Sequence, residues 1–251
     1  MNNILKINNL SKHFNGITAL DDFSLSLERG SITGIIGPNG AGKTTLFNVL
    51  SGFLDADSGE IHFKDTNILG MPSYKISNFG ISRTFQDLRL IMNLTVLDNV
   101  LLAVKNQTGE NVLSALFCPK KLNKEELENK EKAVSILEHV NLKEKVDDPA
   151  GNLSYGQQKL LSLACCLASD AEILMLDEPV AGIHPEIIER MLKIVKELKT
   201  NGKTIILIEH NLNAVARVSD RVIVMDEGEK VAEGKHEDVL NDPKVLEAYL
   251  E

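Results

Sequence analysis

A glycine-rich stretch near the N-terminus constrains this chain more than any other part of its sequence. It reads Gly37-Pro38-Asn39-Gly40-Ala41-Gly42-Lys43-Thr44-Thr45. An apolar run over residues 32–36 precedes it and another over residues 46–50 follows it, which predicts a strand, a tight turn and a helix. The spacing Gly-x4-Gly-Lys-Thr is that of a phosphate-binding loop, whose glycines let successive backbone N–H groups turn towards a triphosphate.

The residue types of this loop predict its chemistry. The start of the following helix adds a partial positive charge. Lys43 is expected to reach the β- and γ-phosphates, and the Thr44 hydroxyl to ligate Mg²⁺. A flexible turn that matches the spacing by accident is the alternative, and the flanking strand and helix count against it. We expect the nucleotide to be bound by Gly37, Asn39, Gly40, Ala41, Gly42, Lys43, Thr44 and Thr45.

Composition excludes several classes of protein. The 251 residues, 43% hydrophobic and 25% charged, suit one large globular domain or two small ones. A net charge of −9 argues against nucleic acid as a partner. The three cysteines, Cys118, Cys165 and Cys166, lack the spacing of a zinc site or a disulfide framework. There is no apolar run of about 18 residues and no signal-peptide layout, so we expect a soluble, intracellular chain that reaches any membrane through a partner.

The order of apolar segments predicts the fold class. Residues 4–30 are expected to form short strands, with alternation from Phe23 onward, and residues 60–63 a further strand. Residues from about 87 to 170 are expected to be mostly helical, with the charged run 120–132 as a solvated helix face. Strands at 173–176, 204–208 and 221–225 then alternate with an amphipathic helix at 186–199. This alternation predicts a parallel sheet covered on both faces.

Three polar residues follow predicted buried strands. Asp177 and Glu178 directly follow the apolar run 173–176, and His210 is the second residue after the run 204–208. Ligands of open α/β sheets bind at such strand ends. We therefore expect Asp177 to be the second magnesium partner and Glu178 to poise a water for attack on the γ-phosphate. A plain turn is the alternative for the acidic pair, and a surface or core histidine is the alternative for His210.

A second motif opens a predicted helix at residues 153–159, Leu-Ser-Tyr-Gly-Gln-Gln-Lys. Ser154 and Gln157 have the spacing of a capping box, and the motif taken alone is simply a helix cap. Gln86 carries no signal from its local chemistry.

Together these pieces resemble the ATP-binding cassette (ABC) ATPases of transporters, over essentially the whole chain. The resemblance rests on residues 37–45, 153–157 and 173–178 with Gln86 and His210. It implies an α/β fold: a P-loop NTPase core with a parallel sheet, an N-terminal antiparallel β subdomain and a helical subdomain. Residues 1–251 would form one ABC ATPase domain, with the core at about 1–86 and 171–251 and the helical subdomain at about 87–170.

The resemblance also implies roles for single residues, with ATP and Mg²⁺ as cofactors. Phe14 would stack on the adenine, and Gln86 would contact Mg²⁺ or the lytic water and couple the site to a membrane subunit. Glu178 would be the general base, and His210 would sense the γ-phosphate. The residues expected to contact ATP held by a second, facing ATPase subunit are Ser154, Gly156 and Gln157.

Within the superfamily the chain looks most like the first ATPase subunit of branched-chain amino acid importers. The likeness lies in residues 83–86, 150–158 and 178–182, in the long segment 105–132 and in the tail 242–251. It implies two transmembrane permease subunits, a second ABC ATPase subunit and a solute-binding protein, at the cytoplasmic face of the cell membrane. Urea or amide importers are near neighbours. An exporter subunit, a soluble ABC switch or a P-loop kinase would also account for part of the pattern.

The chain departs from the family pattern at three positions. Tyr155 replaces the first glycine of Leu-Ser-Gly-Gly-Gln, and Cys165 stands where an arginine is usual. His184 stands where this group commonly has asparagine. Because Pro185 suits the first position of a helix, residue 184 is the predicted N-cap, and histidine caps less well than asparagine.

Overall fold

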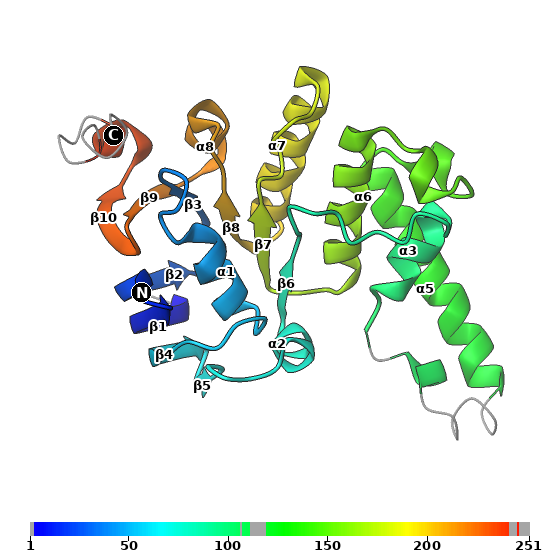
Figure 1. Cartoon of the computed structure of the whole chain (residues 1–251). Helices are drawn as coiled ribbons and strands as arrows, with labels where there is room; N and C mark the ends of the chain where they lie inside the picture. Colours follow the sequence, from blue (N-terminus) through cyan, green and yellow to red (C-terminus); the bar gives the residue numbers. More distant parts are fainter. Residues whose placement is uncertain (1–2, 106, 111–118, 241–244, 246–251) are drawn as a thin grey trace.

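The apolar runs of the sequence fold into two β-sheets, which occupy the left and the centre of Figure 1. The computed structural model describes residues 3–105, 107–110, 119–240 and 245. The smaller sheet is antiparallel, in the order β2-β1-β4-β5. Its strands are β1 (Asn3–Phe14), β2 (Ile17–Glu28), β4 (Ser58–Phe63) and β5 (Thr66–Asn67).

The larger sheet has the order β10-β9-β3-β8-β7-β6 and is parallel except for the antiparallel edge strand β10. Every residue of its central strands β3, β7 and β8 is buried, which is why they read as continuous apolar runs. The predicted parallel sheet is thus confirmed. Its strands are β3 (Ile32–Ile36), β6 (Ile81–Arg83), β7 (Ile173–Asp177), β8 (Thr204–Ile208), β9 (Arg221–Asp226) and β10 (Glu229–Gly234).

The first two strands differ from the expectation. They form a hairpin of two strands of 12 residues each, where short strands were predicted. Register shifts interrupt their pairing, and both Asn9 and Asp22 adopt positive φ values of 48° and 49°. Such bulges break the alternation of buried and exposed side chains, so a long strand resembles several short ones in sequence.

Helices cover the larger sheet and build a separate group at the right of Figure 1. That group contains α3, α5 and α6, which lie between β6 and β7 in sequence. Val100, Leu137 and Leu160 belong to the hydrophobic core that joins them. The charged run on α5 is largely exposed, as predicted. The helices are α1 (Lys43–Leu50), α2 (Ser73–Phe79), α3 (Val96–Leu102), α5 (Pro119–His139), α6 (Tyr155–Ala168), α7 (Pro185–Thr200), α8 (Leu212–Val218) and α9 (His236–Leu240), with 3₁₀ turns at Thr108–Glu110, Lys143–Lys145 and Ala150–Asn152.

A second core fills the space between the two sheets and α1, with Phe23, Phe47 and Ile206 among its members. Cys118 lies outside the described residues, as do residues 106 and 111–118 of the segment 105–132 and most of the tail 242–251. Across the described ranges, no helix combines the length and the apolarity of a membrane span.

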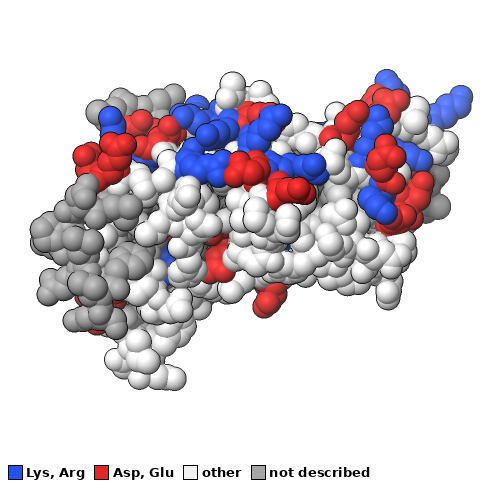
Figure 2. Space-filling model, turned by 90° about the horizontal axis from the view of Figure 1, so that it is seen from above, with Lys and Arg blue, Asp and Glu red and all other residues white. Residues whose placement is uncertain are grey.

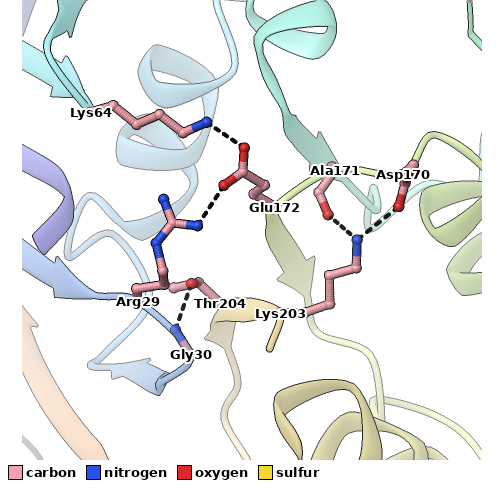
Figure 3. Close-up of polar contacts among 8 residues, drawn as sticks. All are labelled: Arg29, Gly30, Lys64, Asp170, Ala171, Glu172, Lys203 and Thr204. Carbon is pink, nitrogen blue, oxygen red and sulfur yellow. Dashed lines mark hydrogen bonds and ion pairs between the residues drawn. The ribbon is translucent and has the colours of Figure 1, made fainter. Parts of the chain in front are cut away.

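Ion pairs tie the two sheets together at the amino ends of the parallel strands (Figure 3). Glu172, directly before β7, accepts hydrogen bonds from Arg29 (2.7 Å) and from Lys64 of the smaller sheet. Lys203, directly before β8, donates to Asp170 (3.0 Å) and to the carbonyl of Ala171 (2.8 Å). The start of β7 is therefore held from both sides.

The adjacent thiols of α6 are expected to be unreactive. Burial raises the pKa of Cys165 to about 12 and that of Cys166 to about 11. Only the thiolate is a nucleophile, and about one thiol in a thousand or fewer is then ionised at pH 8. In a Cys118→Ser background we expect iodoacetamide to label the native protein about 100-fold more slowly than the urea-unfolded chain. Equal labelling rates, followed by mass spectrometry, would contradict this.

Candidate nucleotide-binding site

The glycine-rich loop joins β3 to α1 and is packed tightly on both sides. A Cβ atom at Gly37 would lie 2.0 Å from the carbonyl oxygen of Met225, and one at Gly42 would lie 2.3 Å from that of Ala19. Both glycines have positive φ, 151° and 93°. Gly40 also has a positive φ of 89°, but nothing lies within 4 Å of its Cβ position. The end of β9 and the start of β2 thus leave no room for a side chain at Gly37 and Gly42.

Lys43 is the first residue of α1 and lies over the loop. Its side chain is buried, and Nζ donates to the carbonyl oxygens of Gly37 (2.8 Å) and Pro38 (2.7 Å). Burial lowers the pKa of Lys43, while the negative charges of Glu178, Asp177 and Asp226 act in the opposite direction. A cation held by weak carbonyl acceptors in this position is poised to exchange them for phosphate oxygens. Thr44 and Thr45 follow in the first turn of α1, where backbone N–H groups have no partner within the helix.

The carboxyl ends of the parallel strands bring the predicted catalytic residues to the same edge. Because β3, β8, β7 and β6 are adjacent and parallel, the segments that follow them share the upper edge in Figure 1. Asp177 is paired with Ile208 across β7 and β8. Nε2 of His210 lies 3.0 Å from Oε1 of Glu178. The predicted common edge for Asp177, Glu178 and His210 is therefore confirmed.

The backbone at Glu178 is held by residues that the sequence analysis did not single out. Glu178 has a positive φ of 46°, its N–H donates to the carbonyl of Ile208 (2.9 Å), and its own carbonyl accepts from Nζ of Lys159. Two residues on, the N–H of Val180 donates to Oε1 of Glu209 at 2.7 Å. Lys159 comes from α6 and Glu209 from the end of β8, so two separate elements fix the chain around Glu178.

Lys159 and Glu209 are both buried, at 5% and 2% exposure. Burial raises the pKa of Glu209, opposed by its backbone hydrogen bonds and by Lys159. Burial also lowers the pKa of Lys159, opposed by Glu209, Glu178 and Asp177. The sequence signal for Glu209 was available, because it is an acidic residue directly after a buried strand. The partner of Lys159 is a backbone carbonyl 19 residues away, which no local pattern indicates.

Asp177 also has a partner that the sequence did not indicate, Arg83 at the end of β6. Nη2 of Arg83 lies 2.7 Å from Oδ2 of Asp177, and their side chains are only 5% and 3% exposed. The N–H of Asp177 also donates to Oγ1 of Thr84 at 3.0 Å. The carboxylate is thus oriented by a buried arginine.

Gln86 and Phe14, which are predicted to contact the magnesium ion and the adenine, lie on two different segments. Gln86 is exposed in the segment after β6. Phe14 ends β1 and is 42% exposed, with Nζ of Lys12 5.4 Å from its ring centre. It is paired with Ile17 at the start of β2, the strand whose Ala19 contacts the loop at Gly42. Phe14 therefore lies on the hairpin next to the glycine-rich loop.

The second motif lies apart from that loop. The predicted capping box is present: the N–H of Ser154 donates to Oε1 of Gln157 (2.9 Å), and the N–H of Gln157 donates to Oγ of Ser154 (3.4 Å). Ser154 is exposed, whereas Gly156 is packed so closely that a Cβ atom would lie 3.3 Å from Ile187. In Figure 1, α6 lies on the opposite side of α7 from α1. A single chain therefore does not bring this motif to Lys43.

Within the described ranges, no group of three or more His, Cys, Asp or Glu side chains has the arrangement of a metal site. Magnesium in nucleotide sites is bound by one or two protein oxygens together with substrate phosphates. The Thr44 hydroxyl, the Asp177 carboxylate and the Gln86 amide are oxygen donors of the required kind. The donor chemistry at this edge therefore fits magnesium carried by a nucleotide.

The N-cap of α7 allows a direct test of one departure in the sequence. The helix begins at Pro185 with His184 as N-cap, as predicted, and Nδ1 of His184 accepts from the N–H of Glu186 over 3.4 Å. This bond is long, and asparagine is a better N-cap than histidine. We expect His184→Asn to raise the melting temperature by about 1–4 °C. An unchanged melting temperature, measured by differential scanning fluorimetry, would contradict this.

Comparison with known proteins places this geometry in a family. Residues 20–181 match the model of the ABC transporter family. A probable branched-chain amino acid transport ATP-binding protein of Archaeoglobus fulgidus is 44% identical over 98% of this chain and 95% of its own length. A high-affinity branched-chain amino acid transport ATP-binding protein of Escherichia coli is 38% identical, over 98% and 97%.

Solved structures of ATP-binding cassettes have the same fold as this chain. A nucleotide-free ATP-binding cassette from an ABC transporter superposes with a TM-score of 0.86 at 40% identity, covering 99% of both chains. The ADP conformation of an ATP-binding cassette of an ABC transporter gives a TM-score of 0.86 at 39% identity, over 100% of this chain and 99% of its own. The α/β architecture predicted from the sequence is thus that of the ABC ATPase fold, and the chain belongs to the ABC transporter family.

Proposed function

We propose that this protein binds ATP with Mg²⁺ at the upper sheet edge and hydrolyses it to ADP and phosphate. The observation that carries the proposal is the convergence of the Lys43 loop, Asp177, Glu178 and His210 on that edge. Phe14 would stack on the adenine, and the loop from Gly37 to Thr45 would bind the phosphates. Thr44, Asp177 and Gln86 would hold Mg²⁺, which supplies charge stabilisation to the transferring phosphoryl group.

Glu178 is the base in this proposal. Its carboxylate is only 17% exposed and lies beside His210, and its backbone is fixed by Lys159 and Ile208. A carboxylate held in this way can orient a water and accept its proton as the oxygen attacks phosphorus. Nε2 of His210 can then donate a hydrogen bond to the carboxylate or to the γ-phosphate.

Phosphate release from ATP tests the proposal. The wild-type protein should release inorganic phosphate in the presence of Mg²⁺, and Lys43→Ala should weaken ATP binding by about 10- to 100-fold, the value of a charge-assisted hydrogen-bond donor. Lys203→Ala, which removes an ion-paired lysine at the opposite sheet edge, is the matched control. Transfer of the phosphate to a small-molecule acceptor instead of water would indicate a kinase and contradict the proposal.

We further propose that two ATPase subunits face each other, because α6 is separate from the glycine-rich loop within one chain. Ser154, Gly156 and Gln157 of one subunit would then contact ATP bound to the other. Figure 2 looks down on the edge involved: a band of Lys and Arg side chains, mixed with acidic ones, crosses the view, and broad areas beside it carry no charge. A mixed and partly uncharged face suits contact between this chain, whose net charge is −9, and a second subunit. A relative of this chain is the favoured partner, and a second copy is the alternative.

The relatives' names support a transport role. We propose that the chain is the nucleotide-binding subunit of an importer for branched-chain amino acids, peripheral to the cytoplasmic face of the membrane. It would dock on two permease subunits and serve a solute-binding protein through them. A hollow of about 470 Å³ opens beside the segment that carries Gln86, lined by residues that include Leu102, Lys105 and Cys165, and offers a site for a permease segment.

A pull-down tests the transport role separately from hydrolysis. Tagged protein extracted in mild detergent should co-purify with two different multi-span subunits and a second ATPase. Leucine with the binding protein should then stimulate ATP hydrolysis by the reconstituted complex. If urea or amides stimulated ATP hydrolysis instead of leucine, the chain would be assigned to an importer of those solutes. Recovery of soluble partners only, or of nucleic acid, would contradict the proposed transport role. It would not contradict the proposed ATP hydrolysis.

A further inference from the structure

The guanidinium of Arg83 joins three elements that carry the proposed site. It lies at the end of β6 and donates to Oδ2 of Asp177 at the end of β7 (2.7 Å). It also donates to Oδ1 of Asn48 (2.7 Å) and Oγ of Ser51 (3.1 Å), both near the end of α1. Because α1 begins with Lys43 and Thr44, this one side chain links the phosphate-binding helix to the predicted magnesium carboxylate.

Two aromatic rings lie close to the Arg83 guanidinium. The Arg83 carbon Cζ lies 5.3 Å from the ring centre of Phe47 on α1 and 5.0 Å from that of Phe85. Phe85 in turn packs edge to face with Phe53, their centroids 5.4 Å apart. Rotation of the planar cation would lose its hydrogen bonds to Asn48, Ser51 and Asp177 and weaken these ring contacts. Together they set the direction in which Arg83 presents its Nη2 proton to Asp177.

The pair is also isolated from solvent. The Arg83 and Asp177 side chains are 5% and 3% exposed, and Nε of Arg83 is buried without a hydrogen-bond partner in the described structure. Among the described residues, the Asp177 side chain accepts the hydrogen bond of Arg83 through Oδ2, which leaves Oδ1 for a metal. The arginine thus fixes one oxygen and leaves the other free.

We propose that Arg83 is a positioning residue for magnesium: it orients the Asp177 carboxylate so that the free oxygen faces the cation brought by the nucleotide. The inference rests on the proposed nucleotide site and adds a residue to it. A positioning residue of this kind changes the affinity for the metal, by about 10- to 100-fold in measured cases, and leaves the affinity for nucleotide without metal unchanged.

The variant Arg83→Lys tests this with the charge retained. A lysine has one nitrogen in place of the two that reach Asp177 and α1, and it has no planar group to lie against Phe47 and Phe85. The matched control is Arg29→Lys, which alters the 2.7 Å ion pair of Glu172 at the opposite end of the same strand (Figure 3). Circular dichroism and thermal melting establish that each variant is folded.

The readout is the binding of a fluorescent ADP analogue, titrated with Mg²⁺ and repeated in EDTA. For Arg83→Lys we expect the Mg²⁺ concentration at half-effect to rise at least tenfold, with the affinity in EDTA within twofold of wild type. Arg29→Lys should match wild type in both. An unchanged Mg²⁺ titration, or an equal loss of affinity in EDTA, overturns the inference. Failure of the wild-type protein to bind the analogue at all would instead refute the nucleotide site.

Discussion

Glu178→Gln is expected to lower ATP turnover by about 10²–10⁴, the usual contribution of a general base, while ATP binding stays intact. Glutamine has the same shape but does not accept a proton from water at neutral pH. The backbone contacts of residue 178 with Ile208 and Lys159 do not involve its side chain and should persist. Nε2 of His210 can still donate to the amide oxygen. Single-turnover phosphate release measures the loss, and a fluorescent ATP analogue measures the binding.

The matched control for this variant is Glu172→Gln. It removes a carboxylate from the start of the same strand, where Glu172 pairs with Arg29 and Lys64, and should leave turnover near wild type. Turnover of Glu178→Gln close to wild type would show that Glu178 is not the base. A parallel loss of turnover and binding would show that the side chain is needed for structure instead.

Gly37→Ala is expected to destabilise the protein by more than about 3 kcal/mol, at the high end of single-residue effects. The new Cβ atom would lie 2.0 Å from the carbonyl oxygen of Met225, a backbone atom of the buried strand β9. That strand cannot retreat without disturbing its pairing with β3. For a chain of this size, the melting temperature should fall by about 6–12 °C or more.

Gly40→Ala separates the two causes of this loss. Gly40 also has a positive φ, of 89°, but its Cβ position is open. Alanine at this position suffers only the strain of the left-handed backbone conformation, about 1–2 kcal/mol. Thermal unfolding of the two variants should therefore differ by at least about 3 °C. Equal melting temperatures would contradict the close packing of the loop against β9.

The sequence predicted those parts of the site that depend on local pattern. The glycine-rich loop is contiguous, and Asp177, Glu178 and His210 follow strands whose order and direction make their ends meet. The capping box at Ser154 and the N-cap at His184 are likewise local, and both are present.

The contacts of Arg83, Lys159 and Glu209 could not be predicted in the same way. Arg83 meets Asp177 across 94 residues of sequence and Asn48 across 35. From the sequence alone, a charged residue is predicted to be exposed to solvent, since lysine, arginine and glutamate are rarely buried without partners. The partner that allows each of these residues to be buried is known only once the fold is known. The bulges at Asn9 and Asp22 hid the length of the first hairpin for a related reason, because a bulge leaves no fixed residue signature.

Several expectations remain predictions. They include the division into a core and a helical subdomain over about 87–170, and the contacts of Phe14 and Gln86 with nucleotide and metal. The tail 242–251, which supported the likeness to amino acid importers, lies largely outside the described residues.

The capping box of α6 determines which hydrogen atoms this helix can offer to another molecule. The N–H groups of Ser154 and Gln157 are already engaged with each other's side chains. Those of Tyr155 and Gly156, at the first two helical positions, have no acceptor within the helix. Oγ of Ser154 accepts from Gln157 and keeps its own proton to donate. The tip of α6 therefore offers hydrogen-bond donors at a helix N-terminus, which favours an anionic acceptor such as a phosphate.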